Sequence, residues 1–141
     1  MATTMHLDIV SAEQSIFSGT VEFVAARAAH GGRGILPRHQ HGLVQLQPGE
    51  VRVKVEGGEE QFFYVSGGML EVQPNVVTVL ADTAARAKDM DEAAALEAKQ
   101  RAEKALSDRK ADLDYAKAQA ELAAAVAQLR AIQNLRKHLN R

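Results

Sequence analysis

The distribution of glycine and proline divides this chain into two parts. All ten glycines and all three prolines lie between Gly19 and Pro74, and residues 76–141 contain neither. Glycine and proline set turns and interrupt regular structure. The first part must therefore fold with many short connections. The last part is rich in Ala, Glu, Lys, Gln, Leu and Arg, which are strong helix formers. Two structural units of different kinds are predicted.

Strand signals fill the first part. In the clearest case, Val51, Val53 and Val55 alternate with charged residues and precede Gly57-Gly58, a pair that favours a tight hairpin turn. Further strands are predicted at residues 7–9, 20–26, 61–65, 69–72 and 76–81, with a turn at Ser18-Gly19 between the first two. Short strands joined by glycine turns predict an antiparallel β-sandwich or barrel.

The last part predicts two helices, at about residues 90–107 and 113–138. Asp89 followed by Glu92 has the pattern of a capping box, and a second helix start is predicted near Asp112. The second helix carries an apolar stripe of Leu122, Val126, Leu129, Ile132, Leu135 and Leu139. The short connection predicts an antiparallel hairpin. The expected fold class is segregated α+β, with a β-sandwich domain at residues 1–85 and a helical hairpin at 86–141.

Alanine dominates the face that the first helix is expected to turn toward the second. This face comprises Leu96, Leu106 and the alanines Ala95, Ala98, Ala102 and Ala105. A fully buried leucine contributes about 1.5–3 kcal/mol and an alanine far less. Two interpretations stay open. The hairpin either leaves its docking site when another surface accepts it, or it is a static hairpin with a small core.

Residues 28–42 contain several polar candidates for a site. Gly31–Gly34 could present backbone amides to an anion, but no Gly-Lys-Ser/Thr sequence follows, which excludes a P-loop. His30, His39 and His41 meet the minimum for a metal site, but the segment offers no Cys or obvious carboxylate ligand. The favoured interpretation is an exposed loop that contacts another protein, with no metal. Since no Ser/His/Asp arrangement or carboxylate pair stands out, the chain is not expected to be an enzyme by itself.

Charge and composition limit the cellular location and the kinds of partner that are expected. The chain has no cysteine, no apolar run of membrane-spanning length and no signal-peptide pattern in residues 1–7, so a soluble or peripheral cytoplasmic protein is expected. No acid follows Glu121, and the terminal stretch forms a basic end with Arg130, Arg136, Lys137, His138 and Arg141. Such an end suits an acidic protein surface or a nucleic acid. It also suits an ordinary solvated helix end, which the helix dipole favours.

Several specific strings occur in order along nearly the whole chain. They are HLDIVSAE at 6–13, IFSG at 16–19, GILP at 34–37, QPG at 47–49, SGG with LEVQP at 66–74, VTVLADTA at 77–84 and AQLR at 127–130. In these strings the chain resembles the epsilon-subunit family of bacterial F-type ATP synthases. The resemblance implies a sandwich that docks on the gamma subunit and sits on the ring of c subunits, within the rotating central stalk.

The resemblance also implies how the hairpin works. In this family the helices either fold against the sandwich or extend along gamma, where they inhibit ATP hydrolysis and their basic face approaches an acidic segment of the beta subunit. The implied protein is a non-catalytic coupling and regulatory subunit and is a monomer when isolated. It has no nucleic-acid partner and no membrane insertion, and it lies on the cytoplasmic face of the bacterial inner membrane.

The same resemblance assigns residues to partners. The loop facing the c-ring corresponds to Ala29, His30, Gly31, Gly32 and Arg33. The gamma-facing residues are His39 and His41, and the basic residues facing the beta subunit are Arg130, Arg136 and Lys137. The chain departs from the family in this loop, because His30, Gly32 and Arg33 replace the acidic residues of the family's glycine–acidic–glycine–Glu–Leu–Gly pattern. This departure implies either that the surface of the c-ring differs to match the loop, or that the coupling to the rotor is weaker.

A degenerate nucleotide motif is the last feature. Met90–Ala95 keeps the aspartate and final alanine of ATP-binding members, as Asp91 and Ala95, but Ala94 stands where they carry arginine. Arg101 or Arg86 could substitute. Because an arginine fork is the natural partner of a phosphate, weak ATP binding and no resident cofactor are expected. Two alternative functions remain, an ATP-sensing small-molecule regulator and an adaptor whose basic helix binds nucleic acid.

Overall fold

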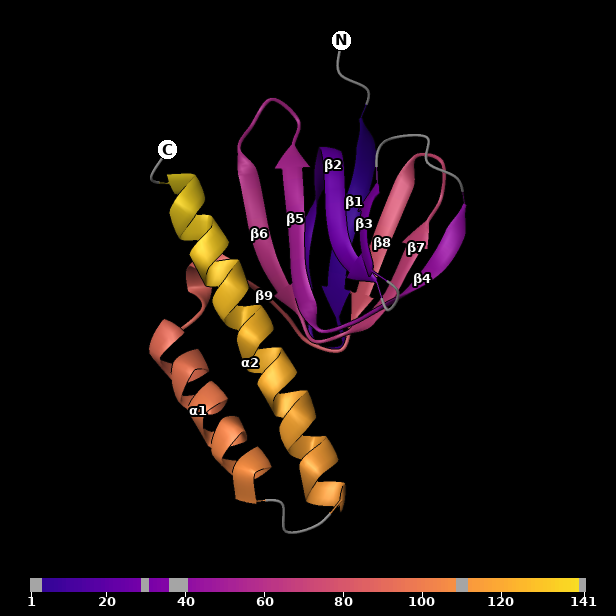
Figure 1. The fold of residues 1–141 in the computed structure, drawn as a ribbon. Coiled ribbons are helices and arrows are strands. Elements are labelled where there is room, and N and C mark those ends of the chain that lie inside the picture. The colour runs from indigo at the N-terminus through magenta and orange to yellow at the C-terminus, as the bar shows by residue number, and fades with distance from the viewer. Residues whose placement is uncertain (1–3, 29–30, 36–40, 109–111, 140–141) are drawn as a thin grey trace.

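The computed structural model describes residues 4–28, 31–35, 41–108 and 112–139. In this part of the chain a nine-stranded sheet precedes the helices (Figure 1). The strands are β1 Met5–Ser11, β2 Ser15–Ala28, β3 Gly31–Ile35, β4 Gly42–Leu46, β5 Gly49–Val55, β6 Glu60–Val65, β7 Gly68–Val72, β8 Val76–Ala81 and β9 Ala84–Arg86. The helices are the 3-10 turn η1 Ala87–Asp89, α1 Glu92–Asp108 and α2 Asp112–Leu139. The predicted segregated α+β class is confirmed.

The long strand β2 holds the sheet together. Its first half pairs with β1, and its second half pairs with β5 and β3. The strand order is β1-β8-β7-β4-β2-β5-β6-β9, so β1 and β2 meet again across the fold and the sheet closes on itself. The β1–β8 pair is parallel and the other pairs are antiparallel. Parallel neighbours need a long crossover connection, and here six strands intervene between them.

The core lies inside this closed sheet and follows the two-residue period of its strands. Val51 and Val53 of β5 and Phe63 of β6 point inward and are fully buried. Residues of β1, β2, β7 and β8 complete the same cluster. Gly68 permits one close approach, because it has a φ of +133° and a Cβ there would lie 2.0 Å from the Leu80 carbonyl oxygen.

Three local predictions are wrong. The Ser18-Gly19 turn does not form, because both residues lie in β2 opposite β1, and the chain reverses at residues 12–14 instead. The supposed loop at 28–42 contains β3, which pairs with β2. Helix α1 is capped by Asp91 and not by Asp89, which lies in η1.

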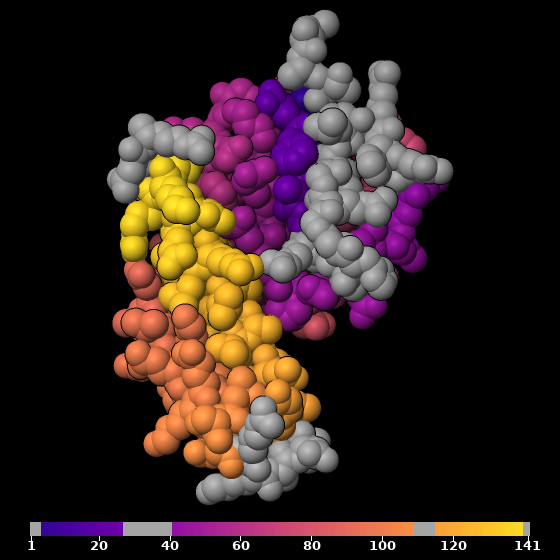
Figure 2. Space-filling model, viewed as in Figure 1, coloured from indigo at the N-terminus to yellow at the C-terminus, as the bar shows by residue number. Residues whose placement is uncertain are grey.

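The hairpin lies against one side of the sandwich. Helix α2 packs along β5 and β6, and α1 packs on α2 on the side away from the sheet (Figure 1). In the space-filling view the C-terminal half of α2 covers these strands, while α1 and the start of α2 project beyond the sandwich (Figure 2). The docked surface is therefore short, and the far half of the hairpin depends on contacts between its own helices.

Candidate functional site

The interface between hairpin and sandwich is built from α2, which is buried on two faces. Ala127 and Ala131 belong to a cluster with Phe62 and Tyr64 of the sandwich. A second set of buried residues, spaced by three, four or seven positions, lies on another side of the helix: Ala118, Ala125, Leu129 and Ile132. Because β6 and η1 pack on the side of Ala127 and Ala131, and α1 also packs on α2, this second stripe faces α1. One helix thus joins both parts of the protein.

The sandwich side of the interface comes from the outward residues of β6. Successive residues of a strand point to opposite faces, so Phe62 and Tyr64 face α2 while Phe63 and Val65 face the core. Ala87 of η1 is buried in the same cluster, and Met90 packs against it. Two aromatic rings therefore rest mainly on the alanines of α2.

Polar contacts fix the position of α2 on this surface. The Asn134 side-chain amide donates a 2.7 Å hydrogen bond to the Glu50 carboxylate of β5. Burial raises the pKa of Glu50, and the Asn134 hydrogen bond acts in the opposite direction. Burial likewise raises the pKa of Tyr64, which forms a hydrogen bond with the Gln128 side chain. The rings of Phe62 and His138 meet edge to face at 5.7 Å.

The contact between the helices is smaller than predicted. Ala95 and Ala102 of α1 are buried, whereas Leu96 and Ala105 are exposed, so the prediction that these two face α2 is wrong. Leu139, expected in the stripe of α2, is exposed as well. The α1 side of the interface between the helices therefore depends on alanine even more than the sequence indicates.

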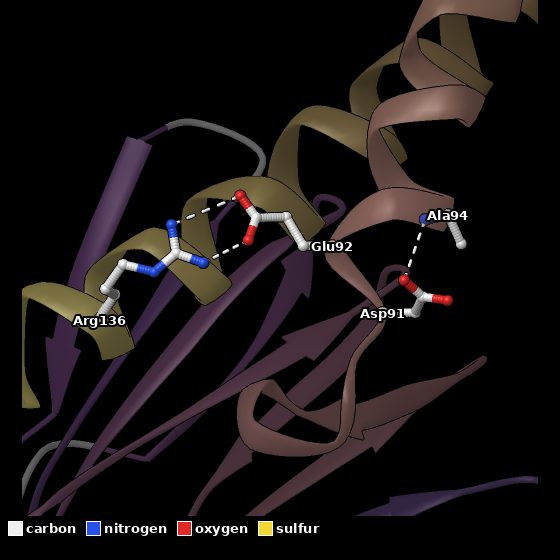
Figure 3. Close-up of polar contacts among 4 residues, drawn as sticks. All are labelled: Asp91, Glu92, Ala94 and Arg136. Carbon is white, nitrogen blue, oxygen red and sulfur yellow. Dashed lines mark hydrogen bonds and ion pairs between the residues drawn. The ribbon is translucent and has the colours of Figure 1, made fainter.

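A charged contact closes the open end of the hairpin. The Arg136 guanidinium of α2 forms a two-pronged ion pair with the Glu92 carboxylate in the first turn of α1 (Figure 3). This hydrogen-bonded pairing raises the pKa of Arg136 above its ordinary value. Arg130 and Lys137, the other two basic residues of interest, are exposed. Of the three basic residues, Arg136 is thus the one held by α1 in this docked form.

The degenerate nucleotide motif does not converge on one point. The Asp91 carboxylate accepts a 3.2 Å hydrogen bond from the Ala94 backbone N–H, as a helix cap does (Figure 3). Ala95 is buried, and Arg101 is exposed ten residues after Asp91, which is about 15 Å of helix. Arg86 donates a 2.8 Å hydrogen bond to the Ile16 carbonyl of the sandwich. Asp91 thus caps the helix, Ala95 packs inside the hairpin, and Arg86 contacts the sandwich.

The predicted loop residues are placed only in part. Ala29, His30 and His39 lie outside the described residues. Gly31, Gly32 and Arg33 form part of β3, beside β2. His41 is exposed directly before β4. Within the described residues, no three His, Cys, Asp or Glu side chains gather as a metal site would require.

An apolar patch on the opposite side of the molecule escaped the sequence predictions. Leu43 of β4, Met69 of β7 and Leu80 of β8 are exposed on three neighbouring strands. Met69 lies directly opposite Leu80, and Leu43 lies diagonally from Met69. The sequence pattern could have indicated that Leu80 faces outward. In its strand Val77, Val79 and Ala81 face inward, and Leu80 lies between the last two.

A Ser/His/Asp grouping occurs near this patch but lacks catalytic geometry. Ser18 Oγ and Asp8 Oδ1 both contact the same nitrogen of His6, Nε2, at 3.3 and 3.1 Å. A triad needs the two partners on different ring nitrogens. The hydrogen bond from Ser18 lowers the pKa of Asp8. The group belongs to the surface of β1 and β2 and indicates no nucleophile.

Comparisons with known proteins cover nearly the whole chain. Residues 4–87 match the family model for the beta-sandwich domain of the ATP synthase Delta/Epsilon chain, and residues 88–133 match the model for its long alpha-helix domain. The chain is 67% identical to the ATP synthase epsilon chain of Nitrosococcus oceani over 139 residues, covering 99% of each chain. It is also 67% identical to that of Thioalkalivibrio sulfidiphilus, covering 98% of this chain and 99% of the relative.

Solved structures are similar in fold. A chain in the Euglena gracilis mitochondrial ATP synthase has a TM-score of 0.80 at 21% identity, covering 96% of this chain and 82% of that one. A chain in the central stalk and c-ring of the Tetrahymena thermophila enzyme has a TM-score of 0.60 at 13% identity, covering 92% and 97%. In the described residues no helix is long and apolar enough to cross a membrane.

Proposed function

Since this chain belongs to the ATP synthase epsilon-chain family, we propose that it is a non-catalytic central-stalk subunit of a bacterial proton-translocating ATP synthase whose helical hairpin regulates ATP hydrolysis. Residues 1–85 would dock on the gamma subunit and the c-ring, and residues 86–141 would regulate. The subunit would lie peripherally on the cytoplasmic face of the inner membrane. The observation that carries the proposal is a complete sandwich to which the hairpin is attached by a short, alanine-based interface.

The apolar patch is the best-supported docking surface for gamma. Leu43, Met69 and Leu80 lie on the part of the sheet that the hairpin leaves uncovered. Exposed apolar groups gathered on neighbouring strands mark an interaction site more strongly than scattered ones. His41, expected to face gamma, comes two residues before Leu43. The segment of Ala29, His30, Gly31, Gly32 and Arg33 is proposed to face the c-ring.

Replacing one leucine of the patch tests this assignment. Leu80→Lys places a charge in the patch and should reduce gamma binding by at least tenfold, measured by titration of gamma with the full chain. Leu96→Lys on α1 is a matched control, because the two leucines are 49% and 45% exposed. If both variants bind gamma like the unaltered chain, the patch is not the docking surface.

The basic end supports the regulatory part of the proposal. Arg130, Arg136 and Lys137 lie in the last turns of α2, without a neighbouring acid in sequence. We expect the variant with all three replaced by Gln to inhibit hydrolysis less in the assembled enzyme, because the extended hairpin would lose its attraction to an acidic beta-subunit surface. The same attraction should weaken as salt rises. Inhibition that is unchanged in this variant would favour a static brace.

A further inference from the structure

The hydrogen bond between Glu50 and Asn134 has an unusual position in this molecule. It joins β5 of the sandwich to the C-terminal half of α2, across 84 residues of sequence. The buried cluster beside it is apolar or aromatic, with Phe62, Tyr64, Ala127 and Ala131, and Gln128 forms a further hydrogen bond with Tyr64. A carboxylate that helps to hold a detachable helix makes docking sensitive to its protonation state.

Docking changes the surroundings of this carboxyl group. Glu50 is partly buried, and its hydrogen bond to Asn134 places it at α2, so departure of the helix is expected to expose its carboxyl group to water. Burial disfavours the charged form, which accounts for the raised pKa of Glu50 in the docked protein. The docked form therefore binds a proton more readily than the undocked form. By linkage, docking strengthens as pH falls toward the ordinary pKa of a glutamate and weakens as pH rises through the raised value.

The neighbouring charged groups do not cancel this effect. Arg52 on β5 and Arg130 on α2 lower the pKa of Glu50, whereas Glu60 on β6 raises it, and the net direction is upward. Tyr64 stays neutral in the acidic range, because its own pKa is raised from 10.0. The ring of His138 also lies at this interface, against Phe62, so this residue needs its own control.

We propose that Glu50 links docking to protonation: burial of its carboxyl group under α2 favours the docked hairpin as the pH falls and releases it as the pH rises, while the hydrogen bond from Asn134, which favours the ionised carboxylate, reduces this effect. This inference refines the regulation of the hairpin in the proposed function. It concerns an equilibrium of the isolated chain, so it can fail while assembly with gamma stands, and the reverse also holds.

The test measures docking directly in the full chain. Because the chain has no cysteine, Gln14→Cys and Gln119→Cys, both at exposed positions, place a fluorescent donor and acceptor on sandwich and hairpin. Energy transfer is followed between about pH 4 and 8, in the urea concentration at which half of the hairpins are docked. The ratio of docked to undocked chains should rise as pH falls, by up to tenfold for each unit by which docking raises the pKa of Glu50.

Glu50→Gln keeps an acceptor for Asn134 but removes the titrating group, so its docking should lose this pH dependence. Glu13→Gln, at an exposed residue between β1 and β2, and His138→Gln should keep it. A pH dependence in Glu50→Gln equal to that of the unaltered chain would overturn the proposal.

A second variant leaves the sandwich unaltered. Asn134→Asp places a carboxyl beside Glu50, and two carboxylates at hydrogen-bonding distance cannot both ionise without a large cost. Docking should be lost near neutral pH and regained on acidification, with at least a tenfold change in the ratio. Docking of Asn134→Asp that equals that of the unaltered chain at neutral pH would also overturn the proposal.

Discussion

Two neighbouring phenylalanines of β6 serve two interfaces of different strength. Phe63 points into the sandwich, where it packs with Val, Leu and Ile side chains that are fully buried. Phe62 points outward, where α2 covers it with alanines. The same strand thus supports a core rich in large side chains on one face and a contact rich in methyl groups on the other. The inner face holds the sandwich together, and the outer face holds the hairpin.

The difference shows how one small chain can combine a rigid and a detachable part. Burying apolar area contributes about 25 cal/mol per Å², and alanine removes little area from water. Docking is therefore worth only a few kcal/mol, while the sandwich has a complete core of its own. A change of about 5.5 kcal/mol moves a two-state population from 1:99 to 99:1. A hairpin held this weakly can be redistributed by a single partner or substitution.

The largest expected effect is the difference in stability between alanine substitutions of the two phenylalanines. Phe63→Ala should destabilise the whole sandwich by about 3–5 kcal/mol, because it leaves a cavity in a closed core. Phe62→Ala should change the sandwich little, since its cost cannot exceed the free energy of docking. Native-state hydrogen exchange separates the two, because it reports strands and helices individually. Phe63→Ala should accelerate exchange in β1, β5 and β8, and Phe62→Ala mainly in α2.

Equal acceleration of hydrogen exchange in the strands by these two substitutions would contradict the division into a rigid sandwich and a detachable hairpin. The hairpin would then be part of the cooperative core, and the regulatory proposal would lose its physical basis. Met69→Ala is a control for the loss of an exposed apolar side chain, and it should leave exchange in both regions nearly unchanged.

The sequence predicts the two parts of the fold because its signals there are local. Alternating Val51, Val53 and Val55, and the absence of glycine and proline after Pro74, act within a few residues of the structure they determine. The Ser18-Gly19 turn failed for the converse reason. A glycine is also compatible with a strand, and pairing of β2 with β1 decides between the two.

The site was less accessible to such reasoning. The sequence indicates that Phe62 and Phe63 face opposite ways, but which face a helix covers depends on α2, more than 60 residues later in the chain. No sequence pattern links Glu50 to Asn134, and the two side chains are in contact only because α2 docks on the sandwich. The face of α1 was misjudged because leucine was expected inside, whereas close packing of two alanine-rich helices leaves Leu96 outside.

An intermediate effect is expected from a charge in the contact between the helices. Ala102 is fully buried, and Ala105, one turn later, is exposed. Ala102→Glu should separate α1 from α2 and cost a few kcal/mol, because undocking is cheaper than burying an unpaired carboxylate. Ala105→Glu should cost less than about 0.5 kcal/mol. Circular dichroism at 222 nm during thermal unfolding measures both. If Ala102→Glu matches Ala105→Glu, the helices are not held by the buried alanines.

The smallest effect is expected at the ion pair between Arg136 and Glu92. Both side chains are largely solvent-accessible, and exposed ion pairs contribute little because water and salt screen them. Glu92→Gln should therefore barely alter the melting temperature of the hairpin. It should nevertheless free Arg136, so inhibition of hydrolysis in the assembled enzyme should strengthen slightly, most visibly at low salt.

Glu97→Gln, on an exposed position of the same helix, removes an equal charge without touching Arg136 and should not strengthen inhibition. Equal inhibition by the two variants at every salt concentration would mean that Arg136 is not shared between Glu92 and a partner, and that this ion pair does not influence whether the hairpin stays docked.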